Sequence, residues 1–173
     1  MSIRDVIIAI NQMEADRVID RYAIGGAVGA TFYLEPIDTF DVDIFVALER
    51  AAGSLLITLE PVFNYLKARG GVTEREYIVV GGFPVQILPP TSALAEEAIA
   101  TAVERDVDGV SARVFTPEYL AAISLETGRA KDKARILQFI EEEALDLQRF
   151  ETLVQHHHLV EKWEKFKRQF LDT

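Results

Sequence analysis

Two aspartates, Asp41 and Asp43, stand two positions apart at the start of the strand-forming run Asp-Val-Asp-Ile-Phe-Val. Successive side chains on a β-strand point to opposite faces, so both carboxylates are expected on one face and Val42 and Ile44 on the other. Burying two such charges is unfavourable unless a positive charge compensates them. Carboxylate oxygens are ligands that suit Mg²⁺. The pair therefore predicts a divalent-metal site on this strand.

A Gly-Gly pair, Gly25-Gly26, follows a short apolar segment at Tyr22 to Ile24 and precedes the acidic pair. Glycine tolerates positive φ values and lets a ligand approach the backbone closely. Residues 27–34 are expected to form a short helix directly after the glycines, whose first N–H groups would face the turn. This arrangement favours an anion, such as a phosphate group, at Gly25 and Gly26.

A basic cluster, Gly128-Arg129-Ala130-Lys131-Asp132-Lys133, opens a predicted helix in an otherwise acidic chain. Arginine offers planar two-point contacts to phosphate, and lysine supplies a mobile positive charge. Asp132 would then be a candidate base for an acceptor hydroxyl. In the alternative interpretation the cluster is a solvated helix start, with Asp132 interacting favourably with the helix dipole. The sequence alone leaves both interpretations open.

Three consecutive histidines, His156 to His158, precede an aromatic series that consists of Trp163, Phe166 and Phe170. Neighbouring helical residues are about 100° apart around the axis, so the three imidazoles are not expected to converge on one metal ion. The aromatic residues recur at helical spacing and are expected to face the core. The alternative is an exposed surface on the C-terminal helices for a second copy of the chain or a partner protein.

The elements that position these groups alternate between helices and strands before the chain becomes helical. Hydrophobic spacing predicts helices over residues 2–20, 27–34, 55–69 and 93–103, and strands over 22–24, 42–48, 76–80, 83–88 and 110–115. Gly81-Gly82 predicts a hairpin between the strands that flank it. Four further helices are expected over 118–126, 131–143, 145–156 and 159–171, with Thr116 as the N-cap of the first and Pro117 at its first position.

These elements predict an α/β (α+β) fold with a small mixed sheet. Residues 1–90 are expected to form the core, and residues 91–173 a mainly helical segment packed on it. The chain has 173 residues, of which 49% are hydrophobic, and this length and composition suit a single packed domain.

Composition excludes several classes of protein. The chain contains no cysteine, which excludes a disulfide framework, cysteine zinc sites and thiol nucleophiles. No apolar run approaches the ~18 residues of a membrane span, and the charged N-terminal stretch is unlike a signal peptide. A cytoplasmic protein is therefore expected. The formal net charge of −10 argues against broad nucleic-acid binding but is compatible with a local basic site.

The succession of strand, Gly25-Gly26, short helix and a strand with Asp41-Val42-Asp43 resembles the DNA polymerase β-like nucleotidyltransferase superfamily. Thr39 is similar to the threonine of a Thr-x-Asp-x-Asp form found in a bacterial branch of small stand-alone proteins. That branch includes abortive-infection and toxin–antitoxin nucleotidyltransferases. Residues 128–132 resemble a Gly-Arg-x-Lys-Asp stretch of the same branch. The main resemblance spans residues 20–90.

The resemblance implies that a nucleoside triphosphate binds with Mg²⁺ and that a nucleoside monophosphate passes to a hydroxyl while pyrophosphate leaves. Asp41 and Asp43 would hold one or two metal ions, which stabilise the attacking and leaving oxygens. Gly25 and Gly26 would hold phosphate groups. By the same resemblance, further roles in nucleotide binding or catalysis are expected for Thr39, Gln86, Arg129, Lys131 and Asp132. RNA and protein are the candidate acceptors.

One position departs from the superfamily. A neighbouring strand usually supplies a third carboxylate, and the matching position here carries Gln86. An amide oxygen can coordinate Mg²⁺ but brings no negative charge. Two alternatives to an active transferase follow: an inactive member of the same fold that binds a nucleotide or a protein partner, and an interaction protein whose acidic pair is structural.

Overall fold

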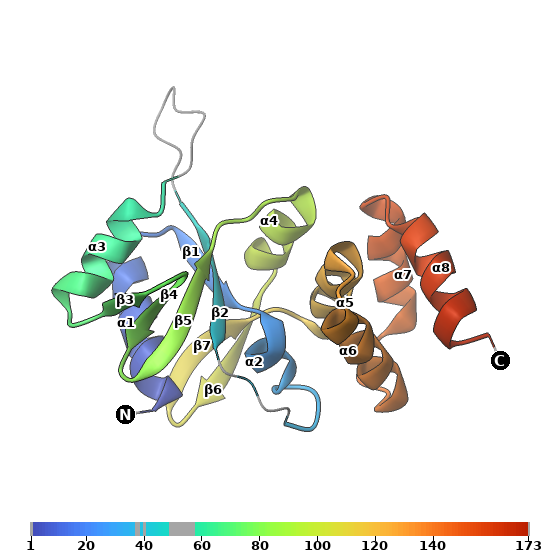
Figure 1. Ribbon diagram of the computed structural model, residues 1–173, viewed down its shortest axis with the longest axis horizontal. Helices are drawn as coiled ribbons and strands as arrows, with labels where there is room; N and C mark the ends of the chain where they lie inside the picture. Colours follow the sequence, from blue (N-terminus) through green and yellow to red (C-terminus); the bar gives the residue numbers. More distant parts are fainter. Residues whose placement is uncertain (1, 37–38, 40, 49–57, 173) are drawn as a thin grey trace.

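The computed structural model describes residues 2–36, 39, 41–48 and 58–172, and Figure 1 shows their arrangement. The described elements are, in chain order, α1 (Ile3–Ala15), β1 (Arg21–Ile24), α2 (Gly26–Ala30), β2 (Val42–Ala47), α3 (Glu60–Ala68), β3 (Val72–Glu74), β4 (Tyr77–Val80), β5 (Phe83–Leu88), α4 (Ala93–Ala100), β6 (Val103–Val107), β7 (Val110–Val114), α5 (Pro117–Thr127), α6 (Ala130–Glu141), α7 (Leu147–His156) and α8 (Val160–Phe170).

The described strands form one mixed sheet in the order β3-β4-β5-β2-β1-β7-β6. At its centre, β2 runs antiparallel to β1 and parallel to β5, and β1 runs parallel to β7. Val42, Ile44 and Val46 are buried while the residues between them are half-buried, as the predicted alternation requires. The predicted α/β fold and mixed sheet are therefore confirmed.

Helices cover both faces of the sheet (Figure 1). On one face, α1 and α3 contribute Ile7, Ile10 and Leu66 to a core that also contains Ile44 of β2. On the other side, a second core joins the sheet to α4 through α8 and includes fully buried Phe139 and Phe150 among its residues. Within this second core α5 contacts α6, α7 and α8, so it places the start of α6 beside the sheet.

Most predicted elements in the second half of the chain are confirmed. Thr116 is the N-cap of α5 and Pro117 is its first residue, although no side-chain hydrogen bond of Thr116 caps the helix. Trp163 and Phe166 are buried and Phe170 is half-buried against the same core, which confirms that the aromatic series faces the core. A partner surface on the C-terminal helices stays a prediction. None of the described helices is long and apolar enough to cross a bilayer.

Some predicted boundaries were wrong. The first helix ends at Ala15 instead of near residue 20, and Arg17, at a φ of 58°, has a left-handed conformation that a helix does not accept. The helix predicted over 93–103 ends at Ala100, because Val103 already begins β6. The helix predicted over 27–34 is only the five residues of α2. Residues 55–57 of the helix predicted over 55–69 lie outside the described residues.

Two edge strands, β3 and β6, were not predicted. All three residues of β3 are exposed, and the three central residues of β6 are exposed and charged. Edge strands often carry charged side chains and need no apolar alternation, so the hydrophobic pattern does not reveal them. Both β6 and β7 belong to the sheet, so two of its strands come from residues after position 90. The described chain contains only helices and their connections from Pro117 onward.

Candidate functional site

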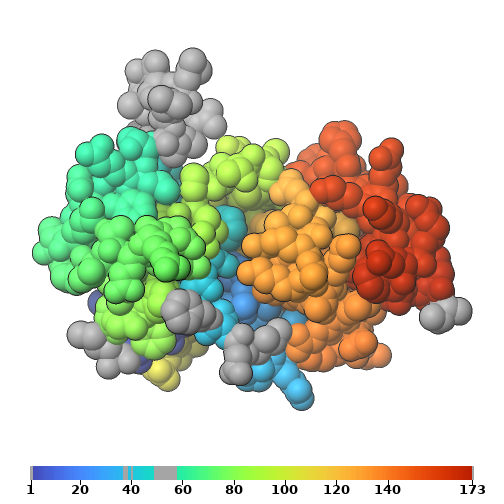
Figure 2. Space-filling model, in the orientation of Figure 1, coloured from blue at the N-terminus to red at the C-terminus, as the bar shows by residue number. Residues whose placement is uncertain are grey.

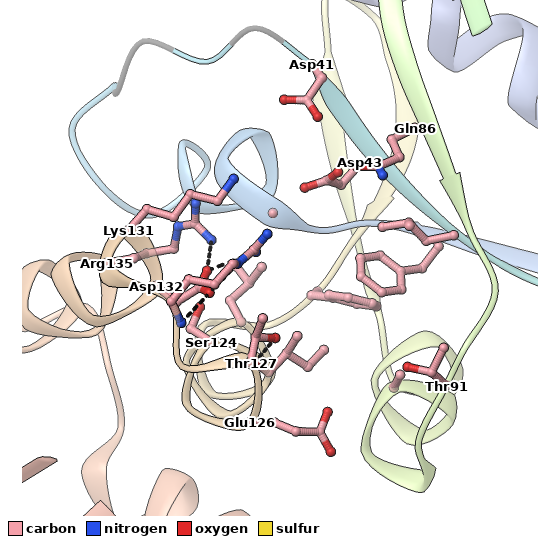
Figure 3. A pocket seen from close by; sticks show the side chains of 18 of the residues that line it. Asp41, Asp43, Gln86, Thr91, Ser124, Glu126, Thr127, Lys131, Asp132 and Arg135 are labelled. Atoms are coloured by element: carbon pink, nitrogen blue, oxygen red, sulfur yellow. Dashed lines mark hydrogen bonds and ion pairs between the residues drawn. The ribbon is translucent and has the colours of Figure 1, made fainter. Parts of the chain in front are cut away.

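A pocket of about 510 Å³ lies between the sheet and the helices α5 and α6. Figure 2 shows a hollow at this place, with α5 and α6 in orange on one side. The close-up in Figure 3 shows Asp41, Asp43 and Gln86 on one side of the pocket and residues of α6 on the other. Its volume is in the range of small-molecule binding sites. The pocket brings together seven of the predicted residues: Gly26, Asp41, Asp43, Gln86, Arg129, Lys131 and Asp132.

The Asp43 carboxylate lies directly against Gly26. A Cβ atom placed on Gly26 would be 1.9 Å from Oδ2 of Asp43, and the φ of Gly26 is +57°. A residue without a side chain, in a left-handed conformation, is therefore needed at this point. The turn thus provides the space in which the acidic side chain sits.

Gly25 is held by the strand and by aromatic rings, and its predicted contact with phosphate stays a prediction. Its N–H donates a hydrogen bond of 3.0 Å to the carbonyl oxygen of Asp43, so this amide is already paired. Gly25 does not line the pocket, and a Cβ atom there would meet the rings of Phe45 and Phe115 at 2.6 and 2.9 Å. We infer that Gly25 allows two aromatic rings to pack beneath the turn.

Thr39 also lies apart from the pocket lining. Its hydroxyl donates a hydrogen bond of 3.2 Å to the carbonyl oxygen of Asp41. This contact holds the backbone just before β2 and leaves the hydroxyl turned to the protein. The direct contact with a nucleotide that the resemblance implies for Thr39 stays a prediction.

Gln86 lies beside Asp43, because the parallel register of β2 and β5 pairs these two residues. Asp43 is therefore flanked by Asp41, the residue directly before its own strand, and by a neutral amide on the next strand. The register confirms that Gln86 lies on the strand next to Asp43, and its equivalence to the third carboxylate of the superfamily stays a prediction.

The acidic pair carries excess negative charge. Burial, and next the charge of Asp41, raise the pKa of Asp43 to about 6. Lys131, Arg135 and Arg129 act in the opposite direction without cancelling this shift. A cation bound at the pair would relieve both the repulsion and the cost of burial.

Arg135 is a pocket residue that the sequence analysis missed. Its side chain is 10% exposed, and its Nη1 atom lies 3.7 Å from Oδ1 of Asp132. Its buried Nε atom has no hydrogen-bond partner among the described residues. An unpaired buried donor is costly, so an anionic ligand in the pocket would stabilise this group. A signal was available: Arg135 follows Lys131 by four residues, which places both on one helix face.

Asp132 is buried and paired with arginines. Its carboxylate accepts hydrogen bonds from Nε of Arg129 at 2.7 Å, from Nη2 of Arg129 at 3.2 Å and from the Arg129 backbone N–H at 3.2 Å. These contacts cap α6 and hold Arg129 at the edge of the pocket. These contacts are those of a residue that positions two arginines. They fit less well the role of a base that accepts a proton from a hydroxyl.

Helix α5 supplies pocket residues that carry no motif, namely Ser124, Glu126 and Thr127. Ser92, the N-cap of α4, donates a hydrogen bond of 3.1 Å to Oε2 of Glu126. Glu76 and Tyr77 complete the opposite rim. These residues reach the pocket through the packing of α5 against the sheet, which no local pattern encodes.

No protein-family model and no curated protein sequence matches the chain. Several solved structures are similar to it, among them the following two. The crystal structure of an antigenic nucleotidyltransferase-like protein from Paracoccidioides brasiliensis superimposes with a TM-score of 0.55 and 18% identity, over 94% of this chain and 89% of its own. The structure of ANT(2″)-Ia in complex with adenylyl-2″-tobramycin has a TM-score of 0.55 and 16% identity, over 88% of this chain and 95% of its own. The chain therefore has a nucleotidyltransferase-like fold.

Proposed function

We propose that this protein binds a nucleoside triphosphate together with Mg²⁺ in the pocket and transfers a nucleoside monophosphate to a hydroxyl group of an acceptor. The observation that carries the proposal is the meeting of Asp41 and Asp43 with the basic residues of α6 across one pocket (Figure 3). The similar structures support it, since one of them holds adenylyl-2″-tobramycin. Membership of the DNA polymerase β-like superfamily, and of its bacterial branch, is part of this proposal.

The donor set of the pocket fits Mg²⁺. Asp41 and Asp43 present carboxylate oxygens and Gln86 an amide oxygen, which are ligands that Mg²⁺ accepts. Gly26 leaves open the space that a side chain would fill next to Asp43. When bound, the metal would neutralise charge on the reacting phosphate oxygens.

The basic residues of α6 would bind and orient the phosphate groups. Arg129 and Arg135 offer planar donors that match phosphate oxygens, and Lys131 adds a flexible positive charge. Asp132 fixes the two guanidinium groups before the ligand arrives, so little side-chain entropy is lost on binding. Preorganised positive charge of this kind stabilises the negative charge that a phosphoryl group bears during transfer.

A labelled-transfer assay tests the proposal. The protein is incubated with each of the four α-³²P-labelled ribonucleoside triphosphates and Mg²⁺, with total RNA or total protein as the acceptor. We expect one nucleotide to label an acceptor and to raise the melting temperature of the protein in a Mg²⁺-dependent way. If no triphosphate raises the melting temperature with Mg²⁺ present, the proposal is wrong.

A second candidate function is nucleotide binding without transfer, and the position of Gln86 beside Asp43 favours it. In that case Mg²⁺ and one triphosphate raise the melting temperature, but no acceptor becomes labelled. The metal that travels with the triphosphate takes ligands from the phosphates, so it depends less on a third carboxylate than a metal at the acceptor hydroxyl does.

Substituting Gln86→Glu is expected to increase the transfer rate by about tenfold or more, because a carboxylate beside Asp43 adds the charge that a second metal ion requires. Single-turnover transfer rates at saturating Mg²⁺ measure the effect. The matched control is Gln148→Glu, which adds the same charge at an exposed position of α7. An unchanged or reduced rate in the Gln86 variant would show that the amide is not what limits transfer.

Mg²⁺-dependent nucleotide binding is expected to weaken as the pH falls below about 6, because the raised pKa of Asp43 lets its carboxylate take up a proton there. The dissociation constant should rise about tenfold for each unit below that pKa. Calorimetric titrations between about pH 5 and pH 8 measure it. Since nucleotide phosphates also titrate near pH 6, the Asp43→Asn variant is the reference, and identical pH profiles for the two proteins would contradict the assignment.

A further inference from the structure

A second cluster of metal-binding side chains lies away from the pocket, where α4, α5 and α7 meet. Glu97 of α4, His156 at the end of α7 and His157 directly after it each place one ligand atom within 4.8 Å of the others. In Figure 1, α5 stands between α4 and α7. None of the three residues lines the pocket described above.

Helix geometry alone predicts no metal site for the histidine run, because it assumes that all three histidines lie on one continuous helix. In the structure, α7 ends at His156 and His157 is its C-cap. The two rings lie edge to face, with centroids 4.8 Å apart and planes at 87°. The third ligand comes from α4, which is remote in the sequence, so that two of the three histidines meet a carboxylate.

Hydrogen bonds already orient this cluster. The Nε2 atom of His157 lies 2.8 Å from Oε2 of Glu97, and the Tyr119 hydroxyl donates a bond of 2.6 Å to Oε1 of Glu97. His156 is exposed, and its imidazole forms no hydrogen bond with any of the described residues.

We propose that Glu97, His156 and His157 bind a first-row transition-metal ion of the Zn²⁺ type. Two imidazoles and a carboxylate form a common donor set for Zn²⁺, with a fourth position left for water. Ligand atoms around a tetrahedral Zn²⁺ lie about 3.3 Å apart. The bonded pair of His157 and Glu97 needs to open slightly from 2.8 Å, and exposed His156 needs to turn inward.

Tyr119 would hold the ligand Glu97 in place through a hydrogen bond. It is buried, and its hydroxyl donates a hydrogen bond of 2.6 Å to Oε1 of Glu97. A donor of this kind fixes the orientation of a ligating carboxylate. A bound ion would connect α4, which packs on the sheet, with α7 of the C-terminal helices. Because this link exists only in the folded protein, the ion would raise its melting temperature.

Titration calorimetry with Zn²⁺ tests the site, on protein made without a polyhistidine tag, freed of metal with a chelator and kept in excess Mg²⁺ so that the acidic pair of the pocket does not take up the Zn²⁺. We expect one Zn²⁺ per chain under these conditions and an increase in melting temperature. The variant His156→Ala should weaken binding at least about tenfold, since even loss of a residue behind a ligand costs that much. His156 is exposed, so this variant is expected to fold normally.

Three further variants decide where the ion binds. Glu97→Gln should weaken binding as His156→Ala does. His158→Asn is the matched control, because it removes a neighbouring exposed imidazole while asparagine tolerates the positive φ of 58° at that position. Asp43→Asn should leave Zn²⁺ binding unchanged. The proposal is overturned if wild-type protein binds no Zn²⁺, if His158→Asn weakens binding as much as His156→Ala, or if Asp43→Asn abolishes it.

Discussion

Asp43→Asn is expected to lower the rate of nucleotidyl transfer by about a thousandfold or more. The substitution keeps the size of the side chain but removes the carboxylate that lies against Gly26 and forms the acidic pair with Asp41. Electrostatic stabilisation of a transferring phosphoryl group contributes several kcal/mol, and about 4 kcal/mol corresponds to a thousandfold in rate. Single-turnover transfer rates of the variant and of wild type at equal nucleotide saturation measure the loss.

The stability of the same variant shows whether a loss of activity is specific. Because the folded protein raises the pKa of Asp43, it binds more protons than the unfolded chain between about pH 4 and pH 6, so this group lowers stability as the pH rises through that range. Asp43→Asn should therefore unfold at equal or higher temperature near neutral pH. Asp20→Asn, at an exposed position before β1, is the control for charge. Transfer within tenfold of wild type would contradict the role of Asp43.

Gly26→Ala is expected to weaken Mg²⁺-dependent nucleotide binding by about tenfold to a hundredfold and to lower the free energy of unfolding by about 1–3 kcal/mol. The new methyl group would lie 1.9 Å from Oδ2 of Asp43, so the carboxylate has to leave its position. The left-handed φ of +57° adds about 1–2 kcal/mol of backbone strain for a residue with a Cβ atom. Calorimetric binding and urea unfolding measure the two effects.

Gly82→Ala is a control that separates strain from collision. Gly82 has a φ of +83°, and a Cβ atom there would meet no atom within 4 Å. It should therefore lose stability through strain alone and keep its nucleotide affinity. The double variant Gly26→Ala, Asp43→Ala removes the colliding carboxylate, so its loss of stability should be smaller than the sum of the two single losses. Additive losses, together with unchanged nucleotide affinity in Gly26→Ala, would show that the two residues do not interact.

Local patterns in the sequence were sufficient for the central elements. The alternation in β2 identified the buried face of Val42, Ile44 and Val46 and the opposite face of the acidic pair. The Gly81-Gly82 link identified the hairpin of β4 and β5. In each case, neighbouring residues impose the conformation, through the two-residue period of a strand or the tight turn that glycine allows.

The tertiary structure decided which of these groups meet. Gly26 and Asp43 come from separate elements, and so do Asp43 and Gln86, which become neighbours only when β2 and β5 pair. The role of Arg135 was equally hidden, since its side chain becomes 10% exposed only through the packing of α6.

The sequence by itself determined the mixed α/β fold, the acidic strand, the glycine turn and the basic start of α6. Only the tertiary structure showed that two aromatic rings lie against Gly25, that Arg135 lines the pocket, and that Glu97 lies near two histidines. The physical reason is the range of the forces involved. Backbone geometry and hydrophobic periodicity act over a few residues, whereas contacts between distant elements arise from burying apolar surface across the whole chain.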